Sequence, residues 1–445
     1  MIQHYSGRLG TFDYDDSMFF IGKSCEGEDQ IHIKEYNLWV NNYTVNMPKG
    51  LLSCEDLFYL AESDGGWHFP KSLTVIFDKD TVLNDCTHMF KFCRFDEDLN
   101  IIDLNIGEVA CTDGMFSGID ISGTVNINTT LQCYLGECMF TSCDLSKFNI
   151  NIQATGVEVS VFEDAIICED FFQKFDFSKC NFINGYELFK GSTFNHSMVK
   201  VDLYSQSINR MFYEATLPKM YASICVNALE SCHPTVYSWD GMFIKAKLPK
   251  FLDLDIEIES GEIPDLDEVI GRYDLFKFAY MFSGCSPQYI HFSERMFTQR
   301  DLYYTGMFEE CNLPDYITET KPIAIMRQFN EVYDKAIVSY NSDYESCKHA
   351  LIELLKSGKS REYIIGYLKE QYRSIDVDSI YVEFNSKLST ECSKNVSSLL
   401  EIPVGSEYCR YTISEVRNKL REAGYPKKIV DDCILNYIGD QYISL

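Results

Sequence analysis

The residues whose types and spacing could bind a charged partner lie in an acid-rich segment that follows Phe251. Eight carboxylates fall within sixteen positions there: Asp253, Asp255, Glu257, Glu259, Glu262, Asp265, Asp267 and Glu268. The first four alternate with apolar residues, so on a β-strand they would share one face. Such a row suits the basic groove of a partner protein or a calcium ion, and it also suits a solvated outer strand face. No D-x-D-x-D-G loop with a closing Glu is present, so we predict that the first seven carboxylates bind a protein partner.

Residues that perform catalysis form no recognisable set in this sequence. The eight histidines are scattered, and none has a partner at ligand spacing: His4, His32, His68, His88, His196, His233, His291 and His349. No nucleophile-elbow, P-loop or dinucleotide-binding motif occurs where a strand meets a helix. We therefore predict that the protein is not an enzyme and uses no cofactor.

The cysteines are predicted to be free thiols. The chain contains 18 of them, but it is too long to need a disulfide framework, and no C-x-x-C pair is present. Cys133, Cys138 and Cys143 follow one another at steps of five without a nearby histidine, which argues against a zinc site. The expected compartment is the reducing cytoplasm, and no metal is expected.

The negative charge is concentrated in one part of the chain. The formal net charge is −28, yet residues 321–445 contain 17 Lys+Arg and 18 Asp+Glu. This leaves 22 basic and 49 acidic residues in 1–320, a net charge of −27. A surface of one sign attracts basic partners and repels phosphates, so we expect no direct nucleic-acid binding by this part. Acidity of this kind also serves solubility alone.

A five-residue Met-Phe motif organises the first 320 residues. It begins with Met or another apolar residue, continues with Phe and, in nine of ten copies, has a small residue in fifth place, as in Met281-Phe282-Ser283-Gly284-Cys285. Ten copies start at Leu57, Met89, Met115, Met139, Val161, Leu188, Met211, Met242, Met281 and Met307. The mean step of about 28 residues is typical of stacked repeats, since one unit cannot bury its own apolar face. We expect the large pair to fill the interior and the small residue, one helical turn further, to let neighbouring coils approach closely.

Short alternating runs between the motifs predict β-strands. They are Leu73–Phe77, Leu99–Leu104, Val125–Asn128, Phe148–Ile152 and Phe251–Ile256. One strand and one short helical turn in each unit would give a curved solenoid. Residues 1–50 lack the usual motif and contain two expected strands, Ile31–Lys34 and Tyr36–Val40. We interpret this segment as an N-terminal cap, because the exposed end of a solenoid must be covered.

The pattern changes to helical periodicity after Pro322. Ile325, Phe329 and Tyr333 suit one helix, and Leu351, Leu354 and Leu355 suit a second. A third follows Ser360, and two more are expected, one capped by Ser414 and ending at Gly424, and one opened by Pro426. The predicted fold class is α+β: a leucine-rich-repeat-like solenoid of short strands and helical turns over residues 51–320, followed by an α-helical domain over 321–445.

The Met-Phe-x-x-Cys motif beside short Ile-x-Leu strands resembles the BspA-like branch of leucine-rich repeats. The resemblance covers roughly residues 50–320 and implies a binding scaffold, although the spacing of 22 to 39 residues and the copies without Met or Cys depart from the pattern. Residues 412–439, through the segment Glu415–Gly424, loosely resemble the three-helix repeats of RecX-type regulators. A plain helical bundle that caps the solenoid explains that segment equally.

The sequence predicts a cytoplasmic, non-enzymatic repeat protein that binds another protein. No run of about 18 apolar residues suggests a membrane span, and Met1–Arg8 do not resemble a signal peptide. Our specific hypothesis is an inhibitor or adaptor whose acidic surface occupies the basic, nucleic-acid-binding groove of a partner protein. The alternative is a structural or surface adhesion component that uses the solenoid as a spacer. The sequence leaves the oligomeric state open.

Overall fold

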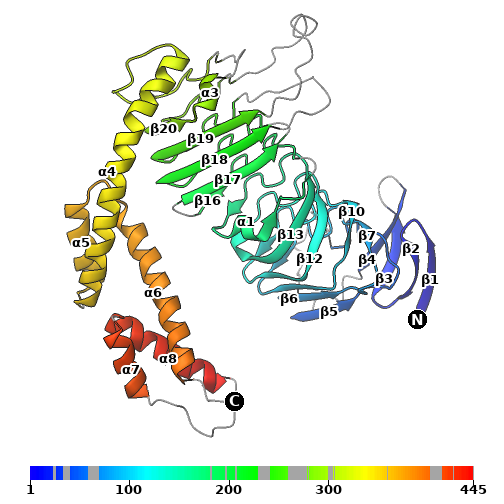
Figure 1. The fold of residues 1–445 in the computed structure, drawn as a ribbon. Coiled ribbons are helices and arrows are strands. Elements are labelled where there is room, and N and C mark those ends of the chain that lie inside the picture. Colours follow the sequence, from blue (N-terminus) through cyan, green and yellow to red (C-terminus); the bar gives the residue numbers. More distant parts are fainter. Residues whose placement is uncertain are drawn as a thin grey trace, which may run out of the picture. The chain divides into compact units, whose positions relative to one another are not determined.

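The computed structural model divides the chain into two compact units, Met1–Glu331 and Val332–Leu445. It describes residues 1–23, 27–33, 41–58, 70–180, 183–195, 198–205, 208–228, 241–258, 278, 280–298, 304, 306–357, 359–400, 413–423 and 425–443. The first unit is a β-solenoid, and the second is helical (Figure 1). The predicted combination of a repeat solenoid and a helical region is confirmed.

Two parallel sheets run along the solenoid. The first contains, in spatial order, β15 (Phe175–Asp176), β13 (Phe148–Val157), β12 (Val125–Leu135), β9 (Leu99–Ile102), β6 (Ser72–Ile76) and β5 (Asn42–Asn46). The second contains β17 (Met198–Ser205), β18 (Tyr221–Ala228), β19 (Phe251–Ile258) and β20 (Tyr289–Phe292). In both sheets each strand pairs with the corresponding strand of the next coil (Figure 1). All five strands predicted from alternation are present.

Each strand turns one row of apolar side chains inward. In β6, Leu73 and Val75 are buried, and their register partners in β9 are Leu99 and Ile101, which are also buried. Because apolar side chains of one coil pack on the equivalent side chains of the next, the coils together form a continuous core. No single coil could form it, so the repeat must occur many times. Shorter parallel pairs complete the coils: β7 (Leu83–Asp85) with β10 (Ile106–Cys111), β8 (Arg94–Phe95) with β11 (Asp120–Ile121), and β14 (Ile166–Ile167) with β16 (Thr193–Phe194). Among the described residues of this unit there are three single-turn helices: η2 (Leu145–Lys147), α1 (Phe171–Lys174) and α3 (Arg295–Thr298).

The Met-Phe motifs do not form the helical turns that their spacing suggested. In the described copies, the residue just before the motif and the fourth residue of the motif have left-handed backbones. Around Met89 these are His88 (φ 54°) and Phe92 (φ 57°). A right-handed helix cannot contain such residues at regular places. Within the motif the N–H groups of Met89, Lys91 and Cys93 each donate to the carbonyl three residues earlier, at 3.1–3.2 Å. The prediction of a helical turn is therefore wrong, and the motif is a tight turn with alternating backbone handedness.

The phenylalanines of the motifs form one stack through the interior. Nine successive ring pairs, from Phe58–Phe90 to Phe282–Phe308, have centroids 5.1–5.8 Å apart and planes within 14° of parallel. The described methionines in first place are buried as well. The predicted interior position of the large pair is confirmed. The tight turn places this ring at the same point of every coil.

The small fifth residue of the motif also makes a hydrogen bond. The thiol of Cys93 donates to the carbonyl of Phe58 in the preceding coil at 3.3 Å, and Cys143 does the same to Phe116 at 3.1 Å. In another coil the hydroxyl of Ser192 donates to Phe162. The sequence predicted a small residue for close approach, and the structure shows that Cys or Ser at this place can also bind the preceding coil, whereas Ala in other copies only packs.

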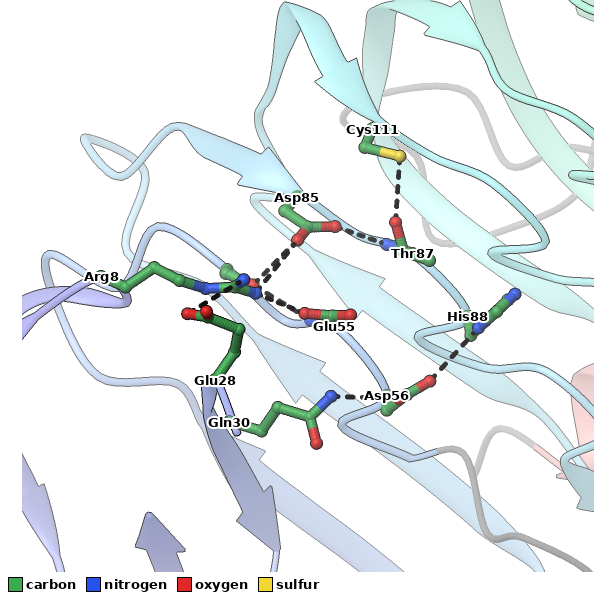
Figure 2. A network of polar contacts seen from close by, with 10 residues as sticks. Arg8, Glu28, Gln30, Glu55, Asp56, Asp85, Thr87, His88 and Cys111 are labelled. Carbon is green, nitrogen blue, oxygen red and sulfur yellow. Dashed lines mark hydrogen bonds and ion pairs between the residues drawn. The ribbon is translucent and has the colours of Figure 1, made fainter. Parts of the chain in front are cut away.

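The N-terminal segment forms two antiparallel hairpins, β1 (Ile2–Gly7) with β2 (Gly10–Asp15) and β3 (Phe19–Lys23) with β4 (Asp29–Ile33). The predicted strand at 31–34 overlaps β4, which begins two residues earlier, whereas Lys34 and the predicted strand at 36–40 lie outside the described residues. Figure 2 shows how the hairpins hold the first coils: Arg8 binds Glu55 and lies 3.8 Å from Asp85, and the Gln30 amide donates to Asp56 at 3.1 Å.

The beginning of α4 (Pro322–Lys356) closes the other end of the solenoid. The ring of Phe329 stacks on that of Phe308 with centroids 6.1 Å apart. The side-chain amide of Asn330 accepts from the backbone N–H of Phe292 and donates to its carbonyl, both at 2.8 Å. Asn330 therefore pairs with β20 much as another strand would.

The second unit continues α4 and adds α5 (Arg361–Gln371), α6 (Val377–Leu400), α7 (Ile413–Glu422) and α8 (Lys427–Ile443). The two helices expected between 325 and 355 are one continuous helix of 35 residues, and α6 was not predicted. Ser360 caps α5 by accepting from the N–H of Tyr363, as expected. Ser414 lies inside α7 rather than at its cap, within the usual uncertainty of helix ends. α8 begins directly after Pro426, as predicted.

Replacing Phe140 with alanine removes one ring from the stack and should lower the free energy of unfolding by about 3–5 kcal/mol. The matched control is Phe92→Ala, because Phe92 belongs to a motif yet is 56% exposed. That change should cost less than about 1 kcal/mol. Urea-unfolding midpoints of the two variants test the stack, and equal losses would contradict it.

Candidate protein-binding surface

The predicted acidic row lies on the outward face of the second sheet. On β19, Leu252 and Leu254 are buried, whereas Asp253 and Asp255 between and after them are half-buried. The alternation predicted for this strand is therefore present. In register with Asp253 lie Ser223 on β18 and His291 on β20. The strand pairing thus brings together polar residues that are 30 to 40 positions apart in sequence.

Asp253 is held by its neighbours on both sides. One carboxylate oxygen lies 2.7 Å from Nδ1 of His291, and the other accepts from the hydroxyl of Tyr221 at 3.5 Å. Burial raises the pKa of Tyr221, and the nearby Asp253 carboxylate raises it further. Side chains from both neighbouring strands therefore position the Asp253 carboxylate on the sheet.

Asp255 keeps hydrogen-bonding capacity. Its Oδ1 is inaccessible to solvent and has no hydrogen-bond partner among the described residues, and the same is true of the hydroxyl of Ser293. The two residues are neighbours across the strands, since the N–H of Ser293 donates to the carbonyl of Leu254 at 3.0 Å. A buried polar atom without a partner costs about 1–3 kcal/mol, so such a pair is a frequent mark of a functional position.

The remaining predicted residues are only partly described. The backbone of Glu257 lies on β19 in register with Asn227. Glu259, Glu262, Asp265 and Asp267 lie outside the described residues. The structure therefore brings Asp253, Asp255 and Glu257 onto one strand and leaves the role of all seven as a prediction.

An aromatic row that the sequence analysis missed runs beside these carboxylates. The rings of Phe251 and Tyr289 stack with centroids 5.1 Å apart, and Tyr289 stacks on Tyr316 at 6.0 Å. The ammonium of Lys250 lies 5.6 Å from the centre of the Phe251 ring, so the row already holds one cation. The signal in the sequence was an aromatic residue two positions before Ser223, Asp253 and His291 in their three strands.

The first sheet presents a different, neutral surface. The amide of Asn126 donates to Asn100 at 3.0 Å, that of Asn149 donates to Asn126 at 3.4 Å, and Ser72 donates to Asn42 at 2.9 Å. These side chains satisfy one another along the strands. Among the described strands of the first sheet, these amide and hydroxyl contacts differ from the row of carboxylates on β19.

The turn side of the solenoid carries cations that are already paired. Lys190 lies 2.8 Å from Glu163 and 3.1 Å from Glu187, and Arg210 lies 3.5 Å from Glu187. Hydrogen bonds from Glu163 and Glu187 raise the pKa of Lys190. Such pairs add little stability, but they neutralise acidic residues on this side.

The cysteines lack the properties of nucleophiles. The fifteen described cysteines are free, and most of them are buried. Burial raises the pKa of Cys285 to about 12 and that of Cys93 well above its ordinary value, so these thiols stay protonated at neutral pH. Among the described residues, no three His, Cys, Asp or Glu side chains gather in a way that could hold a metal ion. Nor is any helix in the described ranges both long and apolar enough to cross a membrane.

Comparison of the chain with protein-family models, with curated proteins and with solved structures finds no match. The sheet geometry and the side chains on it are therefore the basis for any functional inference.

The buried thiols predict that stability falls at alkaline pH. In the unfolded chain a thiol ionises near pH 8.5, whereas in the fold it keeps its proton to a much higher pH, for Cys285 to about 12. The folded state then binds more protons, so each such thiol should remove up to about 1.4 kcal/mol of stability for every pH unit above its unfolded pKa. Urea-unfolding midpoints at pH 7.5, 9 and 10 should decrease in that order.

The variant Cys143→Ser serves as the control, because Ser192 fills the same motif position in another coil and makes the same hydrogen bond. This variant should lose stability less steeply with rising pH than the parent protein, by the contribution of one buried thiol. A midpoint that stays constant up to pH 10 would show that the thiols are not buried as described.

Proposed function

We propose that this chain is a non-enzymatic scaffold that binds a basic protein through the outward face of its second sheet. The observation that carries the proposal is that the half-buried carboxylates of Asp253 and Asp255 on β19 lie beside the partly exposed rings of Tyr289 and Tyr316. The buried ring of Phe251 stacks beneath Tyr289 and supports this row. This combination recognises arginine and lysine side chains, because carboxylates form ion pairs with them and aromatic faces form cation–π contacts with them.

The partner that fits best is a protein with a basic groove that handles nucleic acid. The net charge of −27 in residues 1–320 supports an inhibitor or adaptor that occupies such a groove, and it disfavours direct binding of phosphates by the solenoid. Steering by this charge would speed the encounter with a basic partner and make it sensitive to salt.

The scaffold itself supports a binding role. A stack of similar coils exposes a long, regular surface, and the BspA-like leucine-rich repeats that the motif resembles are binding scaffolds of this kind. If this chain is related to that family, we expect turns with the same alternating backbone handedness in the family's repeats. Free thiols in large number suit a reducing compartment, so we propose the cytoplasm as its location.

Neutralising the row tests the proposal. The variant Asp253→Asn/Asp255→Asn/Glu257→Gln/Glu259→Gln keeps the shapes of the side chains and removes four negative charges. A basic protein captured from the native cell lysate should bind this variant at least about tenfold more weakly, and the dependence of its Kd on salt should be less steep.

The matched control removes the same four charges from exposed positions of other coils: Asp96→Asn, Glu97→Gln, Asp120→Asn and Glu137→Gln. It should leave most of the affinity intact. Equal losses in the two variants would mean that only the overall charge matters, and an unchanged affinity in the first would exclude β19. Recovery of the protein alone from the lysate would favour the structural alternative.

A further inference from the structure

The backbone ladder between the Met-Phe turns has one direction throughout. The N–H of Phe90 donates to the carbonyl of Met115 at 2.8 Å, and the equivalent bond recurs in each step to Phe282, which donates to Met307 at 2.9 Å. On either side of Phe90, His88 donates to Asp113 and Phe92 donates to Ser117. Each coil therefore presents carbonyls to the preceding coil and N–H groups to the following one.

The last coil has no following coil to accept from it. The equivalent donors there are the N–H groups of Gly306, Phe308 and Glu310, and none has an acceptor among the residues that the structure describes. Gly306 (φ 65°) and Glu310 (φ 55°) keep the alternating handedness of the motif. The donors are thus held in the same arrangement as in the coils where a chain segment binds to them.

The helix that closes this end cannot satisfy these donors. Phe329 of α4 continues the ring stack, but the carbonyls of a helix are used within the helix. The first N–H groups of a helix are also unpaired, so the start of α4 at Pro322 brings further donors and no acceptors. The backbone at this end of the solenoid therefore has an excess of hydrogen-bond donors.

A cavity of about 700 Å³ lies at this place, and Gly306 and Phe308 line it. Leu313 and Ile325 are apolar lining residues, and Glu309 and Glu319 are acidic ones. Its volume is within the range of about 300–1,000 Å³ found for ligand sites. The two carboxylates disfavour a small anion, although the donors alone would suit one. A ligand that has a neutral hydrogen-bond acceptor, such as a peptide carbonyl, and a positive charge nearby would satisfy both the N–H donors and the carboxylates.

We propose that this cavity binds an extended, basic peptide segment of a partner protein. The carbonyls of the peptide accept from Gly306 and Phe308, as the next coil does elsewhere, an apolar side chain packs on Leu313 and Ile325, and a lysine or arginine faces Glu309 and Glu319. This is the addition of a chain segment to an open hydrogen-bonding edge. The site is separate from the outward face of the second sheet and does not depend on the function proposed for that face.

The probe is a fluorescein-labelled peptide, acetylated and amidated, of sequence Lys-Gly-Met-Phe-Lys-Gly-Ala-Lys, which combines the motif with basic residues. We expect saturable binding to the full chain by fluorescence anisotropy, and slower amide hydrogen exchange at Gly306, Phe308 and Glu310 in the complex. The same peptide with glutamate in place of every lysine should bind at least about tenfold more weakly.

Two variants locate the site. Glu309→Lys/Glu319→Lys should weaken binding of the lysine peptide at least about tenfold, whereas the charge-matched control Asp96→Lys/Glu97→Lys, on exposed residues of another coil, should retain most of it. Thr320→Trp places a large ring at the exposed rim of the cavity and should abolish binding without changing the unfolding midpoint.

Three results would overturn the proposal. They are failure of the lysine peptide to bind, equal weakening by the two charge reversals, and unchanged amide exchange at the three donors. Displacement of the peptide by inorganic phosphate, with protection of the same amides by phosphate alone, would also overturn it and identify a site for small anions.

Discussion

The fold depends on the hydrogen-bonded ladder that joins each Met-Phe turn to the next. Its alternating handedness places residues such as His88 and Ser142 in the left-handed region, at a cost of about 1–2 kcal/mol for each residue that is not glycine. This backbone strain is offset because the same turn geometry points the phenylalanine ring into the core and the N–H groups toward the next coil. Burial of a Phe side chain contributes about 1.5–3 kcal/mol, so ring and ladder together make the strained turn favourable.

The repeat could be predicted from the sequence because its cause is local. A large apolar pair and a small residue at fixed spacing identify the interior position, and period-two runs identify the strands. The turn geometry was missed because Met-Phe-x-x-Cys is also compatible with one helical turn. The sequence did contain a signal of the left-handed backbone: glycine stands just before the motif at Gly114 and in its fourth place at Gly118 and Gly284. The single long helix α4 was predicted as two, since its apolar positions are interrupted around residues 338–346, where the helix is largely exposed.

The candidate surface could be predicted only in part, for a similar reason. The alternation of Asp253 and Asp255 with leucine and isoleucine is visible in one strand. The aromatic row is not, because Phe251, Tyr289 and Tyr316 become neighbours only through the register of parallel strands and the chain that follows them. Loops of different lengths separate these strands, so spacing in the sequence does not fix which side chains lie side by side. The same argument applies to the pairing of Asp253 with His291.

The two ends of the ladder are chemically different, and this difference is the reason why we propose a peptide site at the C-terminal end. At the first coils, Arg8 and Gln30 of the hairpins bind the side chains of Glu55 and Asp56, so that end is engaged within the chain. At the last coil the closing helix adds donors where acceptors are needed. The segment 313–319 connects the cavity there with the aromatic row, because Tyr316 stacks on Tyr289 while Leu313 and Glu319 line the cavity. The two candidate surfaces are therefore distinct, but each includes residues of this one segment.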